Sequence, residues 1–187
     1  GDHTLGLPGL IQNLNAHGYS KVLDIYGPKG IKKYFELMLD AFLLRGKINF
    51  RIHEIEKDGI VLENRDFKVE ARFMSHTAPC LGYNFIERDR RRVNVSYLRK
   101  IGLKPGAYCK DLQEGKNAKF EGKLVNNKKA TSLVEGKRVT VILDTKLNKN
   151  VGKLAKNSNL LIIESTFADE LKKKAKEYMH LTSVEAA

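Results

Sequence analysis

A glycine-, asparagine- and lysine-rich stretch in the middle of the chain constrains the fold most. Between Ile86 and Arg138 there are fifteen basic and six acidic residues, a net charge of +9, whereas the whole chain of 187 residues carries +12. Few long apolar runs interrupt this stretch, a pattern typical of an extended arm. The sequence therefore predicts a core of residues 1–86, a basic arm of residues 87–136 and a continued core of residues 137–187.

The segment before the arm has the pattern of an α/β or α+β core. Residues 22–26 predict a short apolar strand, and apolar residues at helical spacing predict a helix from Ile31 to Arg45. Alternation of apolar and polar residues then predicts strands at 48–52, 61–62 and 67–73. We expect these three strands to form an antiparallel sheet with one dry face.

The segment after the arm alternates strands and helices. The pattern predicts strands at 139–143 and 160–163 and helices at about 151–156 and 168–179.

Thr182 and Glu185 have the spacing of a capping box, which would begin one more helix. Because the chain stops at Ala187, within the first turn of that helix, we expect it to be a fragment of a longer protein. Gly1-Asp2-His3 indicates the same at the other end, since no strand precedes it.

Composition limits the class of protein. With 42% hydrophobic residues the chain can bury a core, and no stretch approaches the ~18 apolar residues of a membrane span. Cys80 and Cys109 are too few for a disulfide framework, which favours a reduced, cytoplasmic setting. The net charge of +12 makes a polyanion the expected large partner.

Three separate segments carry residues of the types that bind metals, namely histidine and aspartate. Asp2 and His3 precede a Gly-Leu-Pro-Gly run that we interpret as a loop, His76 follows the strand ending at Phe73, and Asp144 follows the strand at 139–143. Metal-assisted hydrolysis needs histidines and carboxylates that converge from separate loops and leave the metal open on one side. We assign the other candidates, His17 and His53, to the surface.

Six segments, in order along the chain, resemble motifs of the ribonuclease Z family in the metallo-β-lactamase superfamily. Residues 2–10 are similar to the second half of the His-x-His-x-Asp-His signature and to the Gly-Leu-Pro-Gly-Leu run after it, and residues 25–30 to the following strand and turn. The other similar segments are His76 with Gly82-Tyr83, Leu143-Asp144-Thr145 for Gly-Asp-Thr, Glu164-Ser165-Thr166-Phe167 for His-Glu-Ala-Thr, and His180 with Thr182, Glu185 and Ala186 for His-Ser-Thr-x-x-x-Ala.

The resemblance implies a site with two zinc ions that hydrolyses a phosphodiester. By this resemblance Asp144 bridges the two ions, His76 binds the first, and Asp2 and His3 bind the second, while Asp2 also orients the attacking water. His180 then donates a proton to the leaving 3′ oxygen. Glu164 either holds His180 in the right tautomer or begins the helix after Phe167.

The chain also departs from the family pattern. Leu143 replaces a glycine, Ile163 replaces a histidine, and Ala107 replaces the proline of a Gly-Pro pair in the arm. The family's first two metal histidines would precede Gly1, and its last would follow Ala187. We therefore expect the chain alone to bind at most one metal ion, and weakly.

The basic arm is similar to the family's projecting arm, which grips tRNA far from the metals. A-form RNA is contacted mostly through phosphates and 2′-hydroxyls, which suits lysine and arginine side chains on an extension. The predicted tRNA-binding residues are Arg88, Arg90, Arg91, Arg92, Arg99, Lys100, Lys104 and Lys110. A charged, solvated insertion is the alternative interpretation.

The sequence thus predicts the four-layer αβ/βα sandwich of the metallo-β-lactamases, truncated at both ends, with a projecting basic arm. The implied function is a zinc-dependent endoribonuclease, a cytoplasmic homodimer that removes the 3′ trailer of precursor tRNA. Two alternatives stay open: an RNA-binding module with an incomplete metal site, and a hydrolase of small phosphodiesters.

Overall fold

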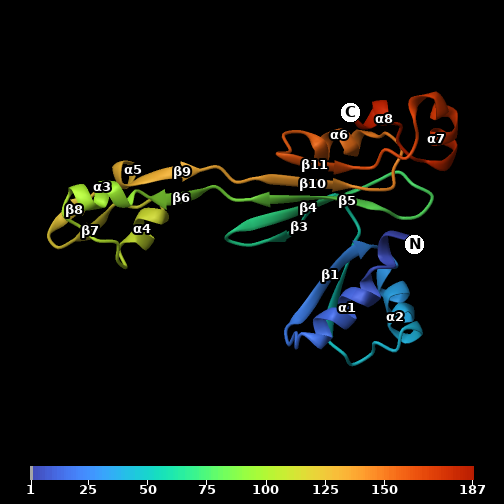
Figure 1. The fold of residues 1–187 in the computed structure, drawn as a ribbon, viewed down its shortest axis with the longest axis horizontal. Coiled ribbons are helices and arrows are strands. Elements are labelled where there is room, and N and C mark those ends of the chain that lie inside the picture. The colour runs from blue at the N-terminus through green and yellow to red at the C-terminus, as the bar shows by residue number, and fades with distance from the viewer. Residues whose placement is uncertain (1) are drawn as a thin grey trace.

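The computed structural model describes residues 2–187, and Figure 1 shows their arrangement. The strands are β1 (Val22–Pro28), β2 (Asn49–Ile55), β3 (Gly59–Glu63), β4 (Phe67–Phe73), β5 (Leu81–Glu87), β6 (Arg90–Val93), β7 (Ala118–Phe120), β8 (Lys123–Val125), β9 (Thr131–Val134), β10 (Arg138–Ile142) and β11 (Leu160–Ile163). The α-helices are α1 (Leu7–Ala16), α2 (Ile31–Ala41), α3 (Val95–Lys100), α4 (Cys109–Gln113), α5 (Asn127–Ala130), α6 (Lys149–Ala155), α7 (Lys172–Tyr178) and α8 (Ser183–Ala186), and 3₁₀ turns cover Asp2–Thr4 and Asp169–Leu171.

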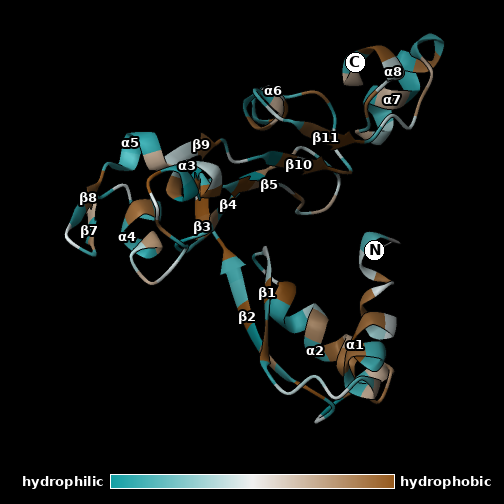
Figure 2. Cartoon of the chain, turned by 60° about the vertical axis from the view of Figure 1, so that its left-hand side comes forward, coloured by the Kyte–Doolittle hydropathy of each residue, from teal (hydrophilic) through white to brown (hydrophobic). Residues whose placement is uncertain are grey.

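A mixed sheet with the order β11-β10-β5-β4-β3 forms the centre of the molecule. β10 and β11 run parallel, while the other neighbouring pairs are antiparallel. β11 is hydrophobic throughout (Figure 2), although Leu160, Leu161 and Ile162 are exposed at this edge of the sheet. The predicted strands of this sheet are confirmed, although the residue 48–52 strand does not join it.

That strand, β2, pairs instead with β1, in parallel, in a separate two-stranded sheet. The expectation of an antiparallel partner for residues 48–52 is therefore wrong. The physical reason is the connection: α2 lies between β1 and β2 in the sequence, and a helical crossover returns the chain in the same direction.

The first helix also differs from the expectation drawn from the sequence. The Gly-Leu-Pro-Gly run expected to be a loop opens α1, with Pro8 in the first turn. Proline is tolerated there because its missing N–H has no partner in the first turn of a helix. The helix predicted from Ile31 is confirmed as α2, but it ends at Ala41 rather than at Arg45, because Leu43 adopts a positive φ of 53°.

The core consists of several small clusters. Ile11, Phe35 and Leu44 bury α1 and α2 against β1 and β2. In a second cluster, Leu154 of α6 packs with Ile142 of β10, and both are fully buried. The Tyr83 hydroxyl donates to the Tyr26 carbonyl at 3.0 Å and joins β5 to β1, and burial raises the Tyr83 pKa to about 12.

The arm leaves the central sheet where β5 and β10 give way to β6 and β9, and it extends to the opposite end of the molecule from α7 (Figure 1). The arm has a hydrophobic core of its own, which the sequence pattern did not indicate. Its buried members are Leu98, Leu103, Tyr108, Leu112, Ala118, Val125 and Ala130. The arm is therefore a small folded unit on a two-stranded connection.

The C-terminal segment follows the sequence pattern closely. The helix expected at 168–179 is divided into a 3₁₀ turn and α7. The capping box of Thr182 and Glu185 is confirmed, with each side chain bonding the other residue's backbone at the start of α8. Within residues 2–187 no helix has both the length and the apolar character that crossing a membrane requires.

The base of the arm is tightly packed at Gly136. A Cβ atom there would overlap the carbonyl oxygen of Glu87, a backbone atom that cannot move aside. Gly136→Ala should therefore lower the free energy of unfolding by about 1–3 kcal/mol, measured by urea denaturation. Gly152→Ala is the control, because a Cβ at this helical position meets open space. It should stabilise the protein by roughly 0.5–1 kcal/mol. Equal stability of the two variants would contradict this packing.

Candidate metal centre

Two parallel strands deliver the first two carboxylates of the site. Asp144 follows the end of β10 and Glu164 follows the end of β11, so the parallel register places them at the same edge of the sheet. The Glu164 N–H donates to the Ile142 carbonyl at 3.1 Å, which continues the ladder to this edge.

His76 is held beside Asp144 by the loop after β4. The Ser75 N–H donates to the Thr145 hydroxyl at 3.1 Å, and the Lys146 N–H donates back to the Ser75 carbonyl at 2.9 Å. His76 Nδ1 lies 3.2 Å from the Met179 carbonyl, an acceptor only, so Nδ1 carries the proton. The other ring nitrogen, His76 Nε2, lies 4.0 Å from Asp144 Oδ2.

The other oxygen of Asp144 faces a second histidine. His3 Nε2 lies 3.0 Å from Asp144 Oδ1, and the His3 side chain is 45% exposed while that of Asp144 is 20% exposed. One carboxylate thus directs its two oxygens to two histidines from different parts of the chain. The side chain of Asp2, the remaining predicted ligand, lies outside the described residues.

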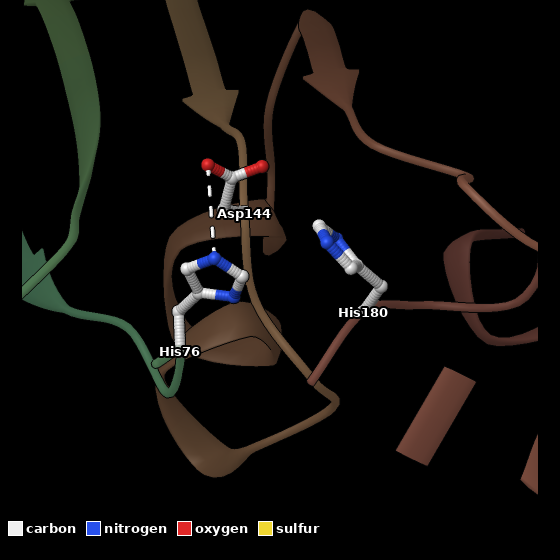
Figure 3. A group of neighbouring side chains, drawn as sticks. All are labelled: His76, Asp144 and His180. Carbon is white, nitrogen blue, oxygen red and sulfur yellow. Dashed lines mark ion pairs between the residues drawn. The ribbon is translucent and has the colours of Figure 1, made fainter. Parts of the chain in front are cut away.

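His180 approaches the same place from the C-terminal segment (Figure 3). His76, Asp144 and His180 each offer one ligand atom, and these three atoms lie within 4.8 Å of one another. The imidazole rings of His76 and His180 are 4.9 Å apart between centroids. The structure therefore brings together His3, His76, Asp144 and His180.

Glu164 fixes the orientation of His180. Its Oε1 accepts from the Thr145 N–H at 2.7 Å and lies 2.8 Å from His180 Nδ1, while Oε2 accepts from the Thr166 hydroxyl at 2.5 Å and from the Leu181 N–H at 3.3 Å. Since a carboxylate only accepts, His180 carries a proton on Nδ1, and its Nε2 is free for the cluster. Of the two roles left open for Glu164, the structure supports the one that orients His180.

Hydrogen bonds outweigh burial at this carboxylate. Burial of Glu164 works to raise its pKa, but hydrogen bonds from Thr166, the Thr145 N–H and His180 bring the pKa below the ordinary value of 4.5. Nearby, burial and the negative charge of Asp144 raise the pKa of Cys80.

Sequence reasoning missed the backbone that joins His76 to His180. Met179 adopts a left-handed conformation, with φ 59°, at the end of α7, and its carbonyl accepts from His76 while the next residue is His180. A glycine or asparagine here would have indicated the turn, but methionine gives no such signal. Thr145 and Thr166 were also missed, although both lie in the quoted motifs.

The other histidines lie away from this cluster. His53 stacks on Tyr26, with ring centroids 4.3 Å apart, and its Nε2 lies 2.7 Å from Asp24. His17 is exposed at the end of α1.

The three departures from the family pattern are accommodated. Ile163 packs against the cluster of Ile142 and Leu154, Leu143 is half-buried, and Ala107 is exposed in the arm.

The predicted tRNA-binding residues lie on or beside the arm. Arg88, at its base, pairs with Glu63 and donates to the Asn64 carbonyl at 3.0 Å. Arg91 is half-buried and donates to the Thr131 hydroxyl at 3.2 Å. The others are exposed, on β6, α3 and α4 and in the loop between the two helices: Arg90, Arg92, Arg99, Lys100, Lys104 and Lys110.

Comparison with known proteins reveals the relationship. No family model matches the chain. The chain is 36% identical over 190 residues to a ribonuclease Z from Bacillus cereus, and 37% identical over 190 residues to a ribonuclease Z from Bacillus anthracis. The chain is a homologue of ribonuclease Z. All of it aligns, and it spans 62% of the length of each of these relatives.

Solved structures establish the fold. The short form of human tRNase Z superposes with a TM-score of 0.64 at 20% identity, covering 100% of this chain and 62% of that one. The metallo-β-lactamase fold protein YhfI from Bacillus subtilis gives a TM-score of 0.56 at 15% identity, covering 99% of this chain and 53% of that one. The predicted metallo-β-lactamase fold is therefore confirmed for this chain, which matches part of each of these structures.

The donor set of this ribonuclease Z homologue fits a divalent metal. Histidine nitrogens and carboxylate oxygens bind zinc at about 2.0–2.2 Å, so the 4.0 Å between His76 Nε2 and Asp144 Oδ2 leaves room for an ion between them. The His76 Nδ1–H bonded to a carbonyl is the support that a metal-binding histidine needs. His76 and Asp144 would hold one ion, and the second oxygen of Asp144 with His3 faces a second position.

The low pKa of Glu164 predicts how stability depends on pH. Because this pKa is lower in the folded than in the unfolded chain, folding favours the carboxylate. Its contribution is complete above the ordinary value of 4.5 and is lost as the pH falls through the folded-state pKa. Glu164→Gln should cost about 1–3 kcal/mol of unfolding free energy at pH 7, because hydrogen bonds to a charged acceptor are lost.

That cost should shrink as the pH falls below 4.5, measured by urea denaturation at each pH. The exposed Glu177 of α7 provides the control, and Glu177→Gln should run parallel to the unchanged protein. A cost for Glu164→Gln that stays constant down to about pH 3 would show that the hydrogen bonds do not depend on the charge.

Proposed function

We propose that the natural protein containing this sequence is a zinc-dependent endoribonuclease that removes the 3′ trailer of precursor tRNA. The observation that carries the proposal is the Asp144 carboxylate, whose oxygens face His3 and His76 beside the Glu164–His180 pair, in a homologue of ribonuclease Z. A carboxylate in this position suits a bridge between two zinc ions, with His76 on one and His3 and Asp2 on the other. Zinc held there would act as a Lewis acid toward the phosphodiester and activate water.

The residues of the chain supply the proton transfer. Cleavage forms a bond from a water oxygen to phosphorus and breaks the bond to the 3′ oxygen, which leaves with a proton. His180 Nε2 faces the cluster while Glu164 holds the proton on Nδ1, so the doubly protonated ring can pass its Nε2 proton to the leaving oxygen. The proton that the attacking water loses passes to solvent, from which His180 is protonated again. Asp2 remains the proposed residue for orienting the attacking water.

The arm supports tRNA as the substrate. Its exposed basic residues lie at the opposite end of the molecule from α7 (Figure 1), and a small phosphodiester would not reach from the cluster to the arm. A folded RNA spans such lengths and is bound mainly through its phosphates. Arg90, Arg92 and Arg99 are exposed for this role, whereas the charge of Arg88 is engaged by Glu63.

We further infer a cytoplasmic homodimer. Large apolar side chains of α1 and α2 and the turn after α2 are exposed, and a second copy could cover them: Leu10, Tyr34, Leu37, Phe42 and Leu43. Cys80 and Cys109 are both free, which suits a reducing compartment. The mass of the natural protein in solution tests the dimer.

A pair of variants of the natural protein tests the division between chemistry and RNA binding. Asp144→Ala should abolish precursor-tRNA cleavage yet leave the Kd for tRNA within about threefold, because the carboxylate serves the metals rather than the RNA. Replacing residues 89–135 by a short Gly-Ser linker should weaken tRNA binding and preserve hydrolysis of a nitrophenyl phosphodiester. Each lost phosphate contact should flatten the salt dependence by about 0.9 in log–log slope, the value for duplex DNA.

The control for charge is the double variant Lys32→Ala with Lys33→Ala, which removes two exposed charges from α2. It should leave the salt slope nearly unchanged. Equal loss of cleavage and binding in Asp144→Ala, or an unchanged salt slope without the arm, would refute the division.

A further inference from the structure

A row of aromatic rings leads away from the candidate metal centre. His180 lies 4.9 Å from His76 between ring centroids, Phe167 lies 6.1 Å from His180, and Tyr178 lies 6.2 Å from Phe167. The Lys174 Nζ lies 5.9 Å from the ring centroids of both Phe167 and Tyr178. The row therefore begins at His76 in the candidate metal centre. It ends at the rings of Phe167 and Tyr178, with the ammonium group of Lys174 beside them.

The backbone holds these rings in place. The Phe167 N–H donates to the Leu181 carbonyl at 3.2 Å, and the Ser183 N–H donates to the Phe167 carbonyl at 2.9 Å, so both sides of Phe167 are tied to the segment that follows His180. Tyr178 comes two residues before His180, in the last turn of α7. The backbones of Phe167 and Tyr178 are therefore fixed close to His180.

The outer rings are accessible rather than part of a core. Tyr178 is 53% exposed, Lys174 is exposed and Phe167 is half-buried. None of the three belongs to the hydrophobic core clusters of the described residues. Exposed aromatic rings beside a lysine are the combination that binds single-stranded nucleic acid, because rings stack on bases and the cation meets a phosphate.

The order of the row indicates which nucleotide would bind. The scissile phosphate belongs at Asp144 and His76, and His180 is the group placed to protonate the leaving 3′ oxygen. The nucleoside that carries this oxygen therefore extends past His180, toward Phe167 and Tyr178. On a precursor tRNA it is the last nucleotide that remains on the tRNA after cleavage.

We propose that Phe167, Tyr178 and Lys174 bind the nucleotide on the 5′ side of the cleaved bond, with its base stacked on the two rings and its own 5′ phosphate beside Lys174. This inference rests on the proposed function, since it takes His180 as the proton donor. Binding of this nucleotide by the three side chains would help to determine which bond of the RNA is cut.

Binding of a fluorescent RNA to the 187-residue chain in EDTA tests the inference without hydrolysis. The probe is a short RNA hairpin with a 3′ single strand, carrying 2-aminopurine as the last nucleotide before the junction. Binding should quench the probe, because stacking on an aromatic ring quenches 2-aminopurine. Tyr178→Ala should remove most of the quenching and weaken binding by about 5- to 150-fold, the range for one stacked base.

Three matched variants sharpen the test. Tyr178→Phe should keep both quenching and affinity, because the ring remains. Lys174→Met should reduce the salt slope by about one phosphate contact. Lys21→Met, which removes an exposed lysine just before β1, should behave as the unchanged chain.

Unchanged quenching in both Tyr178→Ala and Phe167→Leu would overturn the inference, as would stronger quenching of a probe placed on the first nucleotide after the junction. Absence of any RNA binding would refute both the inference and tRNA as the partner. If the natural protein fails to cleave precursor tRNA while the chain gives the expected quenching, the proposed reaction alone is wrong.

Discussion

The Glu164 carboxylate is the interaction on which the site depends. It accepts the N–H of Thr145, next to Asp144, and the N–H of Leu181, next to His180, while it also bonds the His180 ring. Two loops that are far apart in the sequence are thereby held by one acceptor whose side chain is only 9% exposed. The parallel register of β10 and β11 places Glu164 where it can do this.

The same arrangement separates the histidine–aspartate cluster from the basic arm in space. The cluster of His76, Asp144 and His180 forms at the edge of the sheet where β4, β10 and the segment after α7 meet. The basic arm leaves the central sheet at the far ends of β5 and β10 and folds around its own core. Because the arm joins the central sheet only through β5 and β10 and shares no hydrophobic cluster with it among residues 2–187, substitutions can act on one part and spare the other.

Local patterns in the sequence predicted the local structure well. Alternation of apolar and polar residues predicted β2, β3 and β4, the helical spacing after Ile31 predicted α2, and the Thr182–Glu185 pair formed the expected capping box. The motif positions of His76, Asp144 and His180 do converge, and His3 joins them. These features depend on residues a few positions apart, or on motifs that resemble those of the ribonuclease Z family.

Features set by distant partners were not predictable in this way. No local signal shows that residues 49–55 pair with β1 rather than with β3, because the choice depends on the path of α2. The arm's core is built from short, dispersed apolar residues such as Leu98 and Leu112, which never form a long run. Pro8 was interpreted as a loop residue although the first turn of a helix accepts it.

The most direct test of the account is the leaving-group dependence of His180→Ala in the natural protein. A precursor RNA with a bridging 3′ sulfur at the cleavage site has a leaving group that departs without a proton. His180→Ala should slow cleavage of the ordinary RNA by about 10²–10⁴-fold and have little effect on the 3′-sulfur RNA. Equal slowing on both substrates would contradict the role of His180 as the proton donor and, with it, the function assigned to the Glu164–His180 pair.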